Sequence, residues 1–313
     1  MTNTIHLRQI FYCFNSKNIK QSVMYLQKSV WRGIINIKET KDKTDRRKEY
    51  IMAYPVLFVH GMGFHDSRII NYWGRAPKLF EKLGHTVYYG WQDSNGSYYT
   101  NGQAIAERIA QIVEETGCGK VNIVAHSKGG LDARYAISTL GMGKYVASLT
   151  TLSTPHNGSL TIDRIMKLPK FLLKAGSKLT DLWFKILGDK QPDTYSVIKC
   201  FSTEEAKRFN HENPDFPAVR YRSYAFVMRE PWSDMFLWFS NMVVNHFEGE
   251  NDGFLAPRAV KWGEFMGIKR SACRRGISHC DEVDMRRMKF CKKSSKGVSD
   301  IMEVYREIAD DLI

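Results

Sequence analysis

With 313 residues, 43% of them hydrophobic and 25% charged, the chain has the composition of an ordinary globular protein. A chain of this length can bury about three-quarters of its unfolded surface, so its core does not depend on disulfide or metal staples. The net charge of +13 favours anionic partners. No zinc-finger spacing, RNP-like motif or repeat accompanies this charge, which argues against nucleic acid and makes a lipid interface at least as good a partner.

Membrane and export signals are not visible in the sequence. No apolar run reaches the roughly 18 residues that a transmembrane helix needs, and the first residues lack the basic start and apolar core of a secretory signal. We therefore expect a cytoplasmic location by default, while secretion stays open. The six cysteines form no CxxC pair, so we expect mostly reduced thiols, although Cys273, Cys280 and Cys291 are near enough in sequence to lie together.

Residues 1–50 are predicted to be a basic N-terminal extension, and residues 51–313 the main domain. Val23, Leu26 and Val30 fall near helical spacing, with lysines and arginines between them. A basic amphipathic helix can lie on a membrane. More often such a helix packs on its own domain, and we favour that interpretation.

Strands and helices are predicted to alternate along the main domain. Apolar or β-branched runs predict buried strands at 54–59, at 85–90, from Val121 up to Ser127, at 147–152 and at 221–227. Two helical patterns lie between them, and their apolar positions are Ile105, Ile109, Ile112 and Val113, ending at Gly117, and then Leu131, Tyr135 and Leu140. This alternation predicts an α/β fold with a mostly parallel sheet covered by helices on both faces.

The pattern breaks at about residues 159–218, which are rich in leucine, phenylalanine and lysine. We predict an insertion with two short helices separated at Gly176-Ser177. An apolar insertion of this size must cover something. It is either a permanent cap or a lid that moves at a lipid surface.

The stretch from Val121 to Gly130 combines a buried strand, a serine and the start of a helix. A serine on such a sharp turn projects its hydroxyl above the sheet, and Ala125 and Gly129 provide the small residues that the doubled-back chain requires. Ser127 is therefore the candidate nucleophile. The alternative is a serine in an ordinary strand that ends in glycine, since this short pattern is common by chance.

A serine nucleophile needs a histidine base and a carboxylate that orients it. In the α/β-hydrolase arrangement the acid and then the histidine follow the serine in the chain. His279 lies in a loop that leads into a final helix, and it is the only downstream histidine with ample room for an acid loop before it. The candidate acid is Asp252, in an Asn-Asp-Gly turn that follows a strand-like stretch. A simple surface turn is the alternative for Asp252, in which case Asp234 or Glu250 would be the acid.

A tetrahedral intermediate also needs backbone N–H donors for its oxyanion. The residue after the nucleophile, Lys128, supplies one. The loop after the first strand supplies the other, and Met62 is the natural donor there.

Together these motifs make the chain resemble the bacterial triacylglycerol lipases of the clostridial, staphylococcal and pseudomonad types, in the α/β-hydrolase superfamily. The residues that carry the resemblance are His60-Gly61-Met62-Gly63-Phe64, Tyr72-Trp73-Gly74, Val121–Gly130, Thr154–Ser159, Asn251-Asp252-Gly253 and His279–Val283. The resemblance implies an α/β-hydrolase fold with a helical lid. It also implies Ser127 as nucleophile, Asp252 as acid and His279 as base, with Met62 and Lys128 as oxyanion donors.

The same resemblance bears on metals and on location. Pseudomonad-type relatives bind calcium through an aspartate two residues after the catalytic histidine. Asp281 has that position here, but Met285 stands where those relatives have a glutamine ligand. A structural Ca²⁺ at Asp281 is therefore not favoured, and the chemistry needs no cofactor. The zinc-binding insertion of thermophilic relatives is absent. The family is largely exported, although this chain shows no signal.

These observations predict a serine hydrolase that cleaves carboxylic esters of lipids through an acyl-enzyme on Ser127. Long-chain acylglycerols are favoured because of the apolar insertion and the basic charge. A phospholipase or a short-chain carboxylesterase with the same triad is the first alternative. A non-catalytic protein that binds lipid surfaces is the second.

Overall fold

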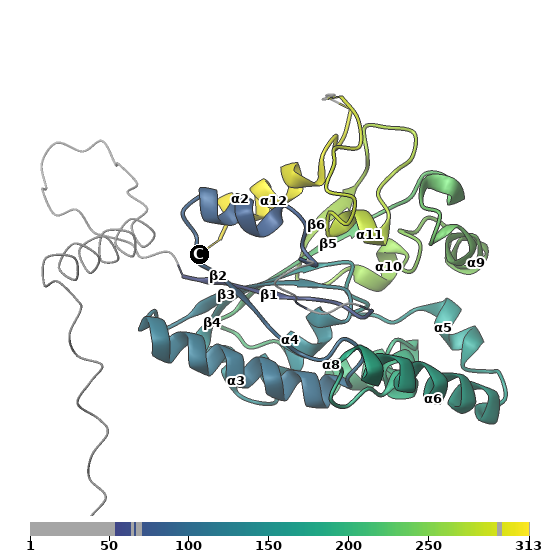
Figure 1. Cartoon of the computed structure of the whole chain (residues 1–313), viewed down its shortest axis with the longest axis horizontal. Coiled ribbons are helices and arrows are strands. Elements are labelled where there is room, and N and C mark those ends of the chain that lie inside the picture. Colours follow the sequence, from purple (N-terminus) through teal and green to yellow (C-terminus); the bar gives the residue numbers. More distant parts are fainter. Residues whose placement is uncertain (1–53, 64–65, 67–70, 293–295, 313) are drawn as a thin grey trace, which may run out of the picture. The chain divides into compact units, whose positions relative to one another are not determined.

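The computed structural model describes residues 54–63, 66, 71–292 and 296–312 (Figure 1). The predicted extension at residues 1–50, with its amphipathic helix, lies outside the described residues. In the part that is described, no helix combines the length and apolar character needed to cross a bilayer.

Six parallel strands form the central sheet in the order β2-β1-β3-β4-β5-β6. Their bounds are β1 Val56–Val59, β2 Val87–Tyr89, β3 Val121–His126, β4 Val146–Leu152, β5 Arg220–Phe226 and β6 Glu264–Lys269. Every residue of β1, β3 and β4 is buried, as expected for strands covered on both faces. The predicted parallel α/β architecture is confirmed.

Helices cover both faces of this sheet (Figure 1). On one face α2 (Ala76–Lys82) and α12 (Ile301–Asp310) pack against alternate strand residues such as Phe58. On the other face α3 (Tyr98–Thr116) and α4 (Gly129–Ser138) pack against the intervening strand residues, such as Leu57, which point to the opposite side of the sheet. The α3 helix ends at Gly117, which has a φ of 64°, because glycine adopts the left-handed conformation without steric cost.

Strand β6 has no counterpart among the sequence predictions. It is an edge strand whose residues are only partly buried, so it lacks the continuous apolar run that marks the inner strands. The remaining elements are η1 (Met142–Tyr145), η2 (Pro231–Ser233), α9 (Trp238–Glu248), α10 (Pro257–Val260) and α11 (His279–Glu282).

The insertion between β4 and β5 is helical, as predicted, but its division is different. It contains α5 (Leu160–Ile165), α6 (Lys170–Leu187), α7 (Thr194–Cys200) and α8 (Thr203–Glu212). The prediction of a break at Gly176-Ser177 is wrong, because α6 continues through both residues. An interior glycine costs a helix only about 1 kcal/mol, and the burial of Ser177 shows that this part of α6 packs inward.

Carboxylates anchor the insertion at its middle and at its start. Asp189, just after α6, accepts the backbone N–H groups of Ser94 and Asn95 at 2.8 and 2.7 Å. At the start of the insertion, Glu248 of α9 accepts the hydroxyl of Ser159 and the N–H of Thr161 at 2.5 and 2.9 Å. The insertion is thereby tied to the loop after β2 and to α9.

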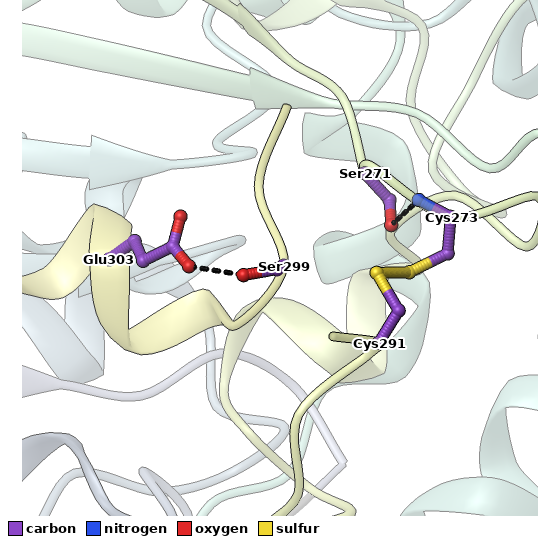
Figure 2. The surroundings of a disulfide bond; sticks show 5 residues. All are labelled: Ser271, Cys273, Cys291, Ser299 and Glu303. Atoms are coloured by element: carbon purple, nitrogen blue, oxygen red, sulfur yellow. Dashed lines mark hydrogen bonds between the residues drawn. A yellow bond between two sulfur atoms is a disulfide. The ribbon is translucent and has the colours of Figure 1, made fainter. Parts of the chain in front are cut away.

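Figure 2 shows a disulfide between Cys273 and Cys291. The prediction of reduced thiols is wrong for this pair, whereas Cys118, Cys200 and Cys280 are free. The sequence could not decide the pairing because it depends on how the chain folds back after β6. The backbone N–H of Cys291 donates to the carbonyl of Ser299 at 3.3 Å, and this hydrogen bond helps to hold the folded-back chain in place.

Candidate active site

Ser127 lies in the sharp turn between β3 and α4. Its φ of 53° is in the left-handed region, a strain that is typical of a nucleophile turn. Its N–H donates to the carbonyl of Leu152 at 2.9 Å, which fixes the turn above β4. At Gly129 a Cβ atom would lie only 2.4 Å from the carbonyl oxygen of His60. Only glycine therefore permits this approach of the turn to the end of β1.

The predicted acid and base are in direct contact. The Nδ1 of His279 lies 2.8 Å from the Oδ2 of Asp252, and the backbone N–H of His279 donates to the carbonyl of Asp252 at 2.8 Å. The other carboxylate oxygen of Asp252 accepts the N–H groups of Phe254 and Leu255, each at 2.8 Å. Burial alone would raise the pKa of Asp252, but the charge and hydrogen bond of His279 and the backbone donor hold it well below its usual range.

Local structure differs from prediction on both sides of this pair. The Asn-Asp-Gly turn follows helix α9 and not a strand, and it reaches the sheet because Met228 donates to the carbonyl of Asn251 at 2.8 Å. His279 does not lie in a loop. It begins the short helix α11, whose N-cap Ser278 forms a capping box with Asp281.

Neither fallback acid contacts His279. Asp234 accepts the hydroxyl of Ser278 at 2.7 Å, and Glu250 pairs with Arg270 at the surface. The ring of His279 lies 4.4 Å, between centroids, from that of His126, the residue before Ser127. The fold therefore brings the acid–base pair to the nucleophile turn.

The two predicted oxyanion donors flank the same turn. Lys128 precedes α4, and N–H groups at the start of a helix have no acceptor inside it. The buried Lys128 side chain turns inward to Asp132 at 2.6 Å, so only its backbone faces the turn. On the other side, a Cβ on Gly61 would lie 2.9 Å from the Cβ of Ser127. Met62 is the next residue in this loop.

Comparison with known proteins identifies the family of this chain. The family model for palmitoyl protein thioesterase matches residues 55–297. The chain belongs to this family. It is 29% identical to triacylglycerol lipase 2 of Saccharomyces cerevisiae, over 78% of this chain and 73% of that protein. It is 30% identical to a triacylglycerol lipase of Vibrio cholerae, over 74% and 80%.

Solved structures agree on the fold. A lipase of Bacillus licheniformis in its mature form is similar with a TM-score of 0.59 and 20% sequence identity, over 90% of this chain and 99% of that chain. This family member is thus a lipase-like serine hydrolase with the α/β-hydrolase fold, an enzyme that cleaves carboxylic ester bonds. The alternative of a non-catalytic lipid-binding protein is not supported.

The carboxylates around Asp281, the position at which the resemblance raises a calcium ion, do not fit a cation in this lipase-like enzyme. Asp281 forms ion pairs with Arg275 and Arg286, and Arg286 also lies 3.4 Å from Asp234. Two guanidinium groups therefore already neutralise these buried carboxylates. A hard cation would need oxygen ligands in the same space, and Met285 offers none.

Three side chains of this lipase-like site were not assigned a role from the sequence. Glu282 is buried beside the acid–base pair, with Oε2 3.2 Å from the Nε2 of His126. The Nδ1 of His126 in turn lies 2.7 Å from the hydroxyl of Tyr72. The sequence could have indicated Glu282, because His279 and Glu282 are three residues apart and residues with that spacing share one face of a helix.

Exposed apolar side chains lie at the site and on the segment that leads to it in the chain. Phe254 meets the ring of His279 edge-on at 5.3 Å and is 47% exposed. Further exposed apolar side chains lie on the η2–α9 segment, which follows β5 and precedes the Asp252 turn: Trp232, Met235, Phe236, Trp238, Phe239 and Met242. A lipid chain would find apolar contacts next to the candidate base.

Proposed function

We propose that this enzyme hydrolyses lipid esters through an acyl-enzyme on Ser127, with His279 as base, Asp252 as orienting acid and no metal ion. The observation that carries the proposal is the 2.8 Å contact between His279 and a fully buried Asp252, beside a serine with a φ of 53°. Because Asp252 is held as the anion, it fixes the imidazole and stabilises its protonated form.

The reaction follows from these positions. His279 accepts the hydroxyl proton of Ser127 as Oγ attacks the ester carbonyl, and the backbone N–H groups of Met62 and Lys128 bind the resulting oxyanion. When the intermediate collapses, the C–O bond to the alcohol breaks and His279 returns the proton to the leaving alcohol. Water then attacks the acyl-enzyme by the same route, which releases the fatty acid and restores Ser127.

Acylglycerols with long chains are the substrates that we favour, because the exposed ring of Phe254 meets that of His279, and exposed apolar side chains such as Trp238 lie on the segment before the Asp252 turn. We expect kcat/KM to rise from short-chain to long-chain acylglycerols, and to be lower for phospholipids and acyl thioesters of equal chain length. A substrate series with matched acyl chains, assayed with and without EDTA, measures this. The highest kcat/KM on short soluble esters, on a phospholipid or on a thioester would contradict the acylglycerol assignment, and a loss with EDTA would contradict metal independence.

We also propose that helix α6 docks on an anionic lipid surface. Phe171, Leu179, Leu182 and Ile186 repeat at helical spacing and are 58–72% exposed. The lysines of α6 are Lys170, Lys174, Lys178 and Lys185, and its one acidic residue, Asp181, is engaged by Thr194. An apolar stripe beside a lysine stripe is the pattern of a helix that lies in a lipid interface.

Changing each stripe should weaken binding to anionic vesicles. We expect Leu179→Ser/Ile186→Ser to reduce vesicle binding about tenfold or more, because each buried aliphatic side chain contributes about 1.5–3 kcal/mol. Lys178→Gln/Lys185→Gln should reduce it by a similar factor, since each lysine near an anionic surface is worth about 1 kcal/mol. Cosedimentation with phosphatidylserine–phosphatidylcholine vesicles measures both.

The matched control is Lys78→Gln/Lys82→Gln, which removes two charges from exposed positions on α2. It should bind vesicles more tightly than the α6 lysine variant. If both lysine variants lost vesicle binding equally, the protein's net charge alone would explain the effect. That result would exclude α6 as the docking element. Hydrolysis of a soluble ester should remain unchanged in every variant.

A further inference from the structure

Two carboxyl groups share the buried space next to His279. Neither Asp252 nor Glu282 has measurable side-chain exposure, and the Oε1 of Glu282 lies 3.8 Å from the Nδ1 of His279. Two adjacent buried carboxylates cannot both ionise without a large electrostatic cost. One proton must therefore be held between them, and the donors around each group decide which one keeps it.

The surrounding donors assign the charge to Asp252. Its carboxylate accepts two backbone N–H groups and the imidazole of His279. Glu282 accepts only neutral side-chain partners, the hydroxyl of Ser153 at 2.9 Å and the ring of His126 at 3.2 Å. Burial, the negative charge of Asp252 and a hydrogen bond to it raise the pKa of Glu282 well above its ordinary value. The proton therefore stays on Glu282.

Hydrogen bonds connect Glu282, through His126 and Tyr72, to the loop of Gly61 and Met62, which we call the oxyanion loop. The hydroxyl of Tyr72 accepts the N–H of Gly61 at 3.1 Å and lies 2.7 Å from the Nδ1 of His126. Burial raises the pKa of Tyr72 far above its ordinary value and lowers that of His126 well below it, so both are neutral. With Tyr72 donating to Nδ1, the Nε2–H of His126 points to Glu282. Because a charged acceptor makes the stronger hydrogen bond, the proton of Glu282 is directed to Asp252.

We propose that Glu282 is a neutral positioning residue, which donates a hydrogen bond to Asp252 and, through His126 and Tyr72, couples the triad acid to the loop of Gly61 and Met62. This inference rests on the triad of the proposed function. It keeps a single negative charge beside His279 and holds the acid and the oxyanion loop in one hydrogen-bonded network. The charged or titratable groups that face this network are Asp252, His279, His126, His60, Tyr72, Tyr305 and Cys280.

The test compares Glu282→Gln with Glu282→Ala in the pH dependence of kcat/KM for a soluble ester. An amide N–H can replace the neutral donor, so we expect Glu282→Gln to leave the midpoint of the acidic limb in place and to retain kcat within about tenfold. Glu282→Ala removes one hydrogen-bond partner from each of Asp252, His126 and Ser153 and should lower kcat about 10–100-fold. A fall of the midpoint by about one pH unit or more in Glu282→Gln would show that an ionised Glu282 acted on His279 and would overturn the proposal. Equal kcat in the native protein and in Glu282→Ala would overturn it as well.

A stability measurement checks the protonation state independently. If folded Glu282 keeps a proton that the unfolded chain loses, the free energy of unfolding of the native protein must fall relative to Glu282→Gln as the pH rises from about 5 to 8. Parallel curves would contradict a protonated Glu282. Glu114→Gln on α3, at an exposed position, is the control and should run parallel to the native protein. The Ser127→Ala variant in the same assay separates the two proposals, because turnover that survives it would count against the triad and not against Glu282.

Discussion

Replacing Ser127 by alanine is expected to lower kcat for a p-nitrophenyl ester by about 10⁶-fold, leaving only the small residual rate that the oxyanion donors and substrate binding provide. The Oγ atom is the only group in the proposed mechanism that bonds to the acyl carbon, so no neighbouring residue can take its place. The same variant should lose covalent labelling by a fluorophosphonate probe, which reacts with activated serines. Its thermal unfolding should stay close to that of the native protein, because the side chain is half-buried and small.

Ser138→Ala is the matched control. This serine ends α4 and donates to the carbonyl of Pro214 at 2.8 Å, away from the nucleophile turn. It should keep full turnover and full labelling. Turnover or labelling that persists in Ser127→Ala would mean that another nucleophile is at work, and would remove the assignment of the whole site.

Replacing His279 by glutamine should have an effect of the same size, about 10⁶-fold in kcat. Without the imidazole, no group removes the proton of Ser127 or returns one to the leaving alcohol. Because serine and histidine act as one unit, the double variant Ser127→Ala/His279→Gln should be no slower than either single variant. Steady-state rates of the three proteins provide the comparison.

His211→Gln serves as the control, because His211 is exposed at the end of α8. It should retain the native rate. A loss in the double variant equal to the product of the two single losses would indicate that Ser127 and His279 act independently, which the triad mechanism forbids.

The Asp252–His279 contact illustrates what can be inferred about a site before the fold is known. Chain order and turn chemistry selected Asp252 over Asp234 and Glu250, and the contact distances support that choice. The sequence pattern nevertheless predicts a strand for the preceding segment, which in the structure is helix α9. Asn-Asp-Gly forms a turn after either element, so the turn was predictable and its neighbour was not.

Local sequence patterns were enough to predict the inner strands β1, β3, β4 and β5, the helix that ends at Gly117, and the nucleophile turn at Ser127. These features depend on residues close together in the chain, such as apolar runs, a terminating glycine and small residues around a serine. Interactions between residues close in the chain specify these features, and tertiary packing is compatible with them.

Three further features depend on tertiary contacts: the continuity of α6, the disulfide of Cys273 with Cys291, and the arginine pairs of Asp281. The position of Glu282 against Asp252 and His126 depends on such contacts as well. Each of these depends on what packs against a residue from elsewhere in the chain. Burial and partners supplied from a distance determine whether a glycine breaks a helix, whether two thiols meet and which carboxyl group keeps its proton, and no local pattern records them.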